Sequence, residues 1–344
     1  VDGEVQIVDI VGDLGGFAFR NLDEPCKNSF DDSEGNRYIT CINADISDAD
    51  SNLGIVTARG NWKGKTKGGL VRTCDNFKTF DRIGMPFGIN AEIDKKLHEI
   101  ENPNVNAGCV NIVWSVADGI RLPVELVLVS NDGGHSFQKA GVFDLAGQPV
   151  ETGYLKVFSD RSRKDLFYGF GGASEIYVSR DGGRNFYQKQ PKEAFPVCDF
   201  GYIDTANKTE VRGEGGKTGI FYLALGDAGL YKLCYDTKTE EIHVKRLTDT
   251  GDACYRMGLG VIGEDRDYLT EEKAIYFCGR LEGEYGFYRT FDEGKSYERL
   301  NQDNQMYGEI NSIDGDKRKF GRFFLATGSR GVLYGEMKRQ SRKI

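Results

Sequence analysis

Apolar and polar residues alternate in short runs along most of the chain, which is the pattern of half-buried β-strands. The segments 124–129 and 175–178 show the alternation plainly, and a glycine-containing turn follows each of them. Long stretches with helical spacing are nearly absent. In residues 89–105, Ile93, Leu97 and Ile100 are spaced for one apolar face, so we expect a short surface helix there. The pattern otherwise predicts an all-β protein with many tight turns.

One short pattern recurs: a hydroxyl residue, any residue, Asp, then glycine, a polar residue and an aromatic. It is clear at 130–137 and 179–186, worn at 73–80 and 290–297, and reduced to a strand with an acidic turn at 228–236. We expect the Asp and the hydroxyl to hydrogen-bond the backbone of their own turn. This is the sequence of an Asp-box, a structural repeat of sialidases and several other propeller families, so its aspartates are not site candidates.

The spacing of the repeat, about 50 residues, is that of a four-stranded propeller blade. The length of 344 residues therefore predicts a seven-bladed β-propeller, with residues 1–344 as a single domain. Composition agrees, because the chain has 45 glycines, 21 Phe and 17 Tyr but only 7 prolines. The segment 320–335 supplies two strands, which we expect to close the ring against the N-terminus.

Charge and residue usage exclude several classes of function. The formal net charge of −8 argues against nucleic acid as a partner, since phosphate binding requires a basic face. No run of 18 apolar residues occurs, so we expect no membrane span. Eight cysteines are spread singly without a C-x-x-C pair, and we expect mostly buried thiols, with disulfides left open. The chain begins at Val1 without an initiator Met or a signal peptide, which indicates a processed or excised start.

The sequence gives little support for a metal site or a cofactor site. The three histidines are scattered, which favours neither a metal site nor a Ser/His arrangement. Residues 48–54 imitate the start of a calcium loop, but Arg59 stands where the bidentate Glu belongs, which leaves at most a lone calcium site open. We expect no cofactor and no structural metal.

The strongest candidate for chemistry is the segment Val11-Gly12-Asp13-Leu14-Gly15-Gly16-Phe17. An apolar run ends in a carboxylate, and two glycines and an aromatic follow, which predicts a strand ending in a tight turn. Asp13 would then stand at the rim of a sheet, where a ligand could approach it closely. The alternative is that Asp13 only caps the turn.

Two tryptophans are candidates for stacking on a sugar. Trp62 lies in the glycine-rich stretch 60–66, which has one residue too few between its glycines for a phosphate-binding loop. This stretch is either a sugar-stacking loop or an ordinary surface loop. Trp114 lies on one face of a predicted strand at 110–115, where core packing is the favoured interpretation and substrate binding the alternative.

Taken together, these stretches resemble the C-terminal half of the endo-xyloglucanases of glycoside hydrolase family 74. The resemblance rests on the segments 12–17 and 112–115, on the repeats that begin at Ser130 and Ser179, and on the ending 307–335. It implies one propeller of a two-propeller enzyme that holds its substrate in a cleft between the propellers. It also implies hydrolysis of the β-1,4-glucan backbone of xyloglucan with inversion, by one aspartate from each propeller.

The resemblance assigns Asp13 as the general acid, and we add Phe17, Trp62 and Trp114 as candidate substrate-binding residues. The partner aspartate would belong to a second, N-terminal propeller in the same or a separate chain, because no second strand end of this kind occurs here. Where the family continues with His and acidic residues, this chain has Ala18-Phe19-Arg20-Asn21. The expected substrate is xyloglucan or a related plant β-glucan, which implies a secreted protein.

Two other functions stay open at this stage. A non-catalytic glycan-binding propeller would keep the cleft wall and its aromatic residues without the chemistry. A sialidase would need an arginine triad and a nucleophilic Tyr with an acidic partner, and we cannot assemble that set from the sequence.

Overall fold

The computed structural model describes residues 4–11, 14–26, 30–31, 37–38, 40–47, 50–59, 69–84, 103–105, 111–116, 126–151, 155–171, 175–194, 196, 210–269 and 272–337. Across these ranges the secondary structure consists of strands, without a helix, which confirms the all-β prediction. It follows that the described residues include no helix able to cross a membrane. Most of the segment 89–105, where a helix was expected, lies outside these ranges, and its last three residues form a strand.

The chain divides into two compact units. Unit 1 comprises Val1–Gln190 with Val197–Ile203, and unit 2 comprises Pro191–Pro196 with Asp204–Ile344.

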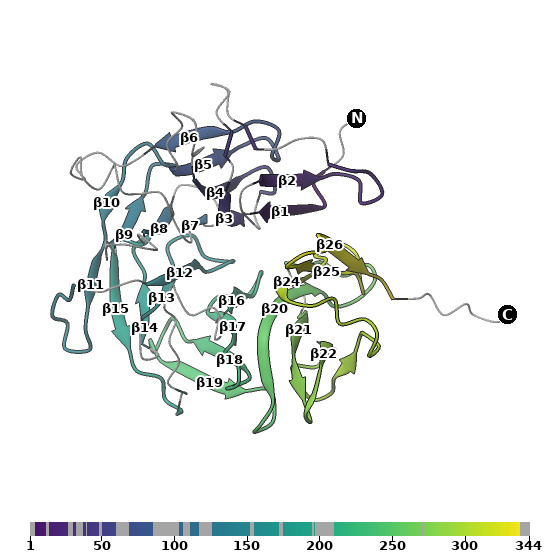
Figure 1. The fold of residues 1–344 in the computed structure, drawn as a ribbon. Helices are drawn as coiled ribbons and strands as arrows, with labels where there is room; N and C mark the ends of the chain where they lie inside the picture. Colours follow the sequence, from purple (N-terminus) through teal and green to yellow (C-terminus); the bar gives the residue numbers. More distant parts are fainter. Residues whose placement is uncertain are drawn as a thin grey trace. The chain divides into compact units, whose positions relative to one another are not determined.

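Unit 1 contains a hairpin, two four-stranded sheets and one five-stranded sheet, in chain order (Figure 1). Neighbouring strands pair antiparallel, except that the outermost strand β11 runs parallel to β15. The strands are β1 (Ile7–Val11), β2 (Gly15–Phe19), β3 (Thr40–Ile46), β4 (Gly54–Arg59), β5 (Gly69–Thr73), β6 (Asp81–Gly84), β7 (Pro103–Val105), β8 (Ile112–Val116), β9 (Leu126–Ser130), β10 (Gln138–Lys139), β11 (Gly141–Phe143), β12 (Lys156–Ser159), β13 (Phe167–Phe170), β14 (Ile176–Ser179) and β15 (Asn185–Lys189).

Unit 2 contains two four-stranded sheets and one three-stranded sheet, all antiparallel. Its strands are β16 (Glu210–Gly213), β17 (Ile220–Ala224), β18 (Leu230–Tyr235), β19 (Ile242–Arg246), β20 (Ala253–Val261), β21 (Lys273–Leu281), β22 (Glu284–Thr290), β23 (Glu298–Arg299), β24 (Ile310–Gly315), β25 (Phe323–Thr327) and β26 (Val332–Gly335).

Successive antiparallel sheets of about four strands, in chain order, are the blades of a β-propeller, so this prediction is confirmed. The predicted number of seven blades is wrong, because the described strands form six sheets of three to five strands beside the hairpin. The prediction divided the chain length by a blade period. Before β3, however, the described residues contribute only the hairpin β1–β2, so this part of the chain adds length without a further blade.

Four turns share one hydrogen-bond pattern, as the recurring sequence predicted. Ser130 Oγ donates to Asp132 Oδ1 (2.7 Å) and accepts from the N–H of Gly134 (2.8 Å). The Asp132 carboxylate accepts from the N–H (3.0 Å) and the hydroxyl (2.6 Å) of Ser136. The turns at 73–80, 179–186 and 290–297 repeat these bonds with their own residues. Their aspartates therefore hold turns closed.

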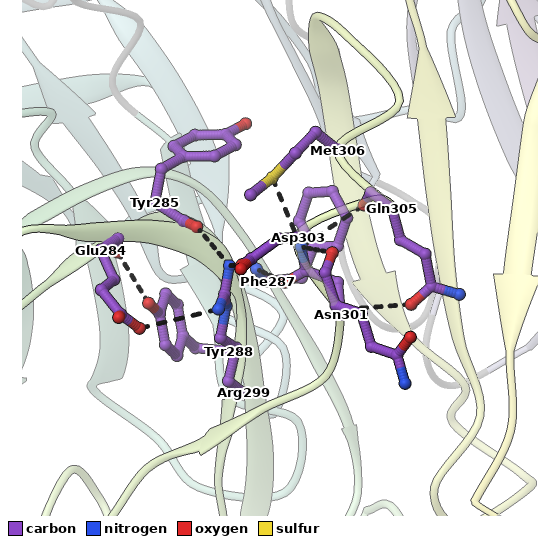
Figure 2. A network of polar contacts seen from close by, with 10 residues as sticks. Glu284, Tyr285, Phe287, Tyr288, Arg299, Asn301, Asp303, Gln305 and Met306 are labelled. Atoms are coloured by element: carbon purple, nitrogen blue, oxygen red, sulfur yellow. Dashed lines mark hydrogen bonds and ion pairs between the residues drawn. The ribbon is translucent and has the colours of Figure 1, made fainter.

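The segment after β23 is fixed to the edge of its sheet by a polar network (Figure 2). Asn301 Oδ1 accepts from the N–H of Phe287 (2.8 Å), and Arg299 Nη2 donates to Asp303 Oδ1 (2.8 Å). Just beyond, Tyr307 has a φ of 55°, and its ring lies parallel to that of Phe287 with centroids 6.3 Å apart. The network thus anchors the start of the segment 307–335, one of the segments on which the family resemblance rests.

The repeated turns predict how stability depends on acid. The hydrogen bonds from Ser296 lower the pKa of Asp292 to about 2, and those from Ser136 hold the pKa of Asp132 well below its usual range. A lowered pKa in the folded state stabilises the fold above the ordinary value of 3.8, and this contribution disappears as the pH falls toward 2. We expect a variant with Asp132→Asn and Asp292→Asn to unfold at lower urea concentration at pH 7, and to approach the unmodified protein near pH 2.

The matched control for this experiment is Glu264→Gln, which removes an exposed carboxylate outside the turns. It should follow the unmodified protein at every pH. A difference between the double variant and the unmodified protein that stays constant down to pH 2 would contradict the assignment of the acid dependence to these turns.

Candidate functional site

The predicted catalytic segment lies on the hairpin β1–β2. The register pairs Val11 with Gly15, and these two strand residues flank the segment 12–14 that contains Asp13. Gly12 and Asp13 themselves lie outside the described residues. Leu14 is 63% exposed, and Gly15 has a φ of 97°, a conformation that favours glycine. The two strands that flank the loop thus fit the predicted tight turn.

Gly16 is required by a close contact with the core. A methyl group added at this residue would lie 2.2 Å from Cε2 of Phe30. The Phe30 ring is 2% exposed and lies in a cluster with Phe77 and Phe80, with centroids 5.8 and 4.5 Å away. Two of the three glycines of the segment therefore have structural reasons: Gly15 adopts a φ that favours glycine, and Gly16 lets the hairpin lie against an aromatic ring.

Arg20 fastens the other end of the hairpin. Its Nη1 donates to Asn76 Oδ1 (2.8 Å) and its Nη2 donates to the Asn76 carbonyl (2.6 Å). The same Oδ1 accepts from the N–H of Val5, just before β1 (2.9 Å). Asn76 belongs to the repeated turn at 73–80 and has a φ of 60°. Asn76 thus joins both strands of the hairpin to the turn, β2 through Arg20 and β1 through Val5.

The four predicted site residues have different outcomes. Asp13 and Trp62 lie outside the described residues. Phe17 is partly buried on β2, with its ring 6.5 Å from that of Phe19. Trp114 on β8 is 0% exposed, and the ring of Phe137 lies edge-on to it with centroids 5.7 Å apart. A fully buried ring offers no face to a sugar, so the geometry of Trp114 agrees with core packing.

Sequence reasoning did not single out Asp9, Arg20 or Phe30. Asp9 had a signal, because it is a lone carboxylate inside the apolar run 7–11. The bidentate bond of Arg20 and the contact of Phe30 join residues far apart in the chain, so no local pattern indicates them. Burial raises the pKa of Asp9 above its ordinary value.

Other reactive groups have structural surroundings. The described cysteines are free thiols, and burial raises the pKa of Cys41 to about 12 and that of Cys278 to about 11. Within the described ranges, no three or more His, Cys, Asp or Glu residues are grouped so that they could hold a metal ion.

The contact with Phe30 predicts the effect of a minimal change at Gly16. We expect Gly16→Ala to lower the free energy of unfolding by about 1–3 kcal/mol, because the added methyl group overpacks the ring cluster. Urea denaturation measures the change. Introducing Phe30→Leu into this variant should recover part of the loss, since the two residues are in contact.

The control is Gly328→Ala, where the nearest atom to the added methyl group is 3.4 Å away, an ordinary contact. Its effect should stay within about 0.5 kcal/mol of zero. Equal effects at the two positions would refute the assignment of the loss to Phe30.

Comparison with known proteins gives the chain its relatives. No protein-family model matches it. A xyloglucanase of Paenibacillus sp is 32% identical over 227 residues, which are 65% of this chain and 19% of that protein. An oligoxyloglucan-reducing end-specific xyloglucanase of Emericella nidulans is 29% identical over 248 residues, which are 69% of this chain and 29% of that protein. The chain thus spans less than a third of the length of these curated relatives.

Among solved structures, the GH74 xyloglucanase of Xanthomonas campestris matches 98% of this chain and 42% of its own, with a TM-score of 0.73 and 19% sequence identity. At that identity the match establishes the fold alone. The sequence matches to xyloglucanases cover about two thirds of the chain. The chain is therefore similar in sequence to xyloglucanases over about two thirds of its length, and its β-propeller fold resembles that of a GH74 xyloglucanase.

Proposed function

We propose that this chain is the C-terminal propeller of an inverting endo-xyloglucanase and supplies the general acid, Asp13, from one wall of a cleft between two propellers. The observation that carries the proposal is the sequence similarity to xyloglucanases, 32% over 227 residues. The hairpin adds support, since Gly15 and Gly16 fit the tight turn that the sequence predicts for the segment of Asp13.

A general acid must reach the substrate in its protonated form and lie close to the leaving oxygen. The segment that contains Asp13 lies between two paired strands, and Leu14 within it is 63% exposed. We infer that this segment enters the cleft that the polymer occupies. Bound glucan would exclude water from the loop and so raise the pKa of the acid, as burial does for carboxyls in general.

The second carboxylate of an inverting pair must stand about 6.5–9.5 Å from the first, which leaves room for the attacking water. Opposite walls of a cleft provide such a separation. In this chain the aspartates of the repeated turns are engaged by their own turns, and no second segment like 11–17 occurs. We infer that the base belongs to a second propeller, in the same or a separate chain, that the substrate is a plant β-glucan such as xyloglucan, and that the protein acts outside the cell.

The test is depolymerisation of xyloglucan by the purified chain, alone and together with the proposed second propeller, with binding recorded in parallel. We expect the chain alone to bind the polymer without cleaving it. Adding the second propeller should produce hydrolysis, and Asp13→Asn should lower that rate by about 10²–10⁴-fold, the usual contribution of a general acid.

Each other outcome corrects a different part of the proposal. Hydrolysis by the chain alone that Asp13→Asn abolishes would show that a complete pair forms within this chain or a dimer of it. Binding without hydrolysis, even with the second propeller, would favour a non-catalytic glycan-binding module. Neither binding nor hydrolysis would overturn the proposed function.

A further inference from the structure

The hairpin β1–β2 has two unlike faces. Val8, Ile10 and Ala18 pack against the cluster of buried side chains that contains Phe30. Because side chains alternate across a strand, the residues between them point to the opposite face. Asp9 lies there, and the register places it directly opposite Phe17 on β2.

Asp9 is an unusual residue for its position. Strands disfavour Asp, and a partly buried carboxylate without a partner costs stability. Asp9 is partly buried, and it makes no hydrogen bond or ion pair with any residue that the structure describes. Burial raises its pKa accordingly. Carboxyl groups with these properties gather at functional sites, where a ligand supplies the missing partner.

The neighbours of Asp9 on this face are apolar, with Ile7 and Val11 beside it on β1 and two aromatic residues opposite on β2. Phe17 lies directly across the hairpin, and the ring of Phe19 is 6.5 Å from that of Phe17, tilted by 41°. Both side chains are partly exposed. Gly15, next to Phe17 on the same face, adds no side chain. The face therefore combines one hydrogen-bond acceptor with apolar rings, the usual composition of a small-molecule site.

A neutral pyranose has the complementary surface, with hydroxyl donors at its rim and an apolar C–H face. A carboxylate accepts hydrogen bonds from two hydroxyls at once, and bonds to a charged group are the stronger kind. The same carboxylate repels a sugar acid, since two like charges brought together without a counter-ion are unfavourable. The chemistry of the face thus favours neutral sugars over uronic acids.

We propose that Asp9, Phe17 and Phe19 form a sugar-binding subsite on the hairpin. In this subsite Asp9 accepts hydrogen bonds from the hydroxyls of a neutral glucosyl unit, and the two rings contact the C–H face of the sugar. This inference rests on the proposed function, because it takes a β-glucan as the ligand. It assigns Asp9 to substrate binding and to discrimination against charged glycans, a role separate from proton transfer by Asp13.

The experiment compares the unmodified chain with Asp9→Asn, Phe17→Ala and the control Asp23→Asn. Asp23 is an exposed carboxylate just beyond the hairpin in the same unit. Binding to soluble xyloglucan is measured by calorimetry at neutral pH, with a polymer rich in uronic acids as the second probe. We expect Asp9→Asn to weaken binding to xyloglucan about ten-fold, and Phe17→Ala by a similar factor. Asp23→Asn should bind as the unmodified chain does.

The stability of the Asp9→Asn variant distinguishes a binding role of Asp9 from a structural one, because the two roles predict changes of opposite sign in the unfolding midpoint. Because Asp9 has a raised pKa and no partner in the described structure, Asp9→Asn should raise the unfolding midpoint at neutral pH while it weakens binding. A structural carboxylate would instead lose stability on the same change. We also expect Asp9→Asn to narrow the preference for xyloglucan over the uronic acid polymer.

The outcomes separate the two proposals. If the unmodified chain binds xyloglucan, and Asp9→Asn binds equally well or lowers the unfolding midpoint, the subsite is refuted while the proposed function stands. If the unmodified chain does not bind xyloglucan, both the proposed function and the subsite are refuted.

Discussion

The packing of the Phe30 ring against the backbone of Gly16 decides where the hairpin β1–β2 can lie. The ring leaves no room for a side chain at Gly16. The hairpin therefore lies close against the buried cluster that contains Phe30, and Val8 and Ile10 pack against the same cluster. The bidentate bond from Arg20 to Asn76 then fixes the end of the hairpin away from its loop. A two-stranded hairpin alone is at best marginally stable in water. Held by these contacts, the hairpin supports the strands on either side of the segment that contains Asp13, as the proposed role of a catalytic acid would require.

The carboxylates of this chain fall into classes that their partners distinguish better than their pKa shifts do. Asp132 and Asp292 are surrounded by donors within their own turns, which lowers their pKa values. Asp314 has a pKa raised by burial, yet it accepts from the N–H groups of Leu259 and Gly315 and so serves the packing of β24 on β20. Asp9 combines a raised pKa with the absence of a partner among the described residues. Only this last combination leaves hydrogen-bonding capacity for a ligand, so accounting for partners is the stronger criterion for function.

A feature could be predicted from the sequence when the residues that determine it lie close together along the chain. The repeated turns were predictable because every bond in them joins residues within eight positions, so the pattern Ser130 to Phe137 contains its own explanation. The blade count was not, since it depends on how the chain at its ends is divided among sheets. The glycines of the site segment were recognised, but the reason for Gly16 lies with Phe30, a residue that no local pattern connects to it. For Trp114, alternation along the strand predicted one face, and the burial of the ring agrees with packing in the core.

The difference between local and long-range features also explains how one carboxylate of a catalytic pair can be recognised in a sequence without its partner. An inverting hydrolysis places its two carboxyls on opposite sides of the reacting sugar, with a water between one of them and the anomeric carbon. The edge of a single sheet can place carboxyl groups on only one side of the sugar. A cleft between two domains can place one carboxyl group on each side. Under the proposed function, selection on this wall would act on the short segment Val11 to Phe17 of one hairpin. One wall could then be recognised from a few residues, while the complete site would need the second wall as well.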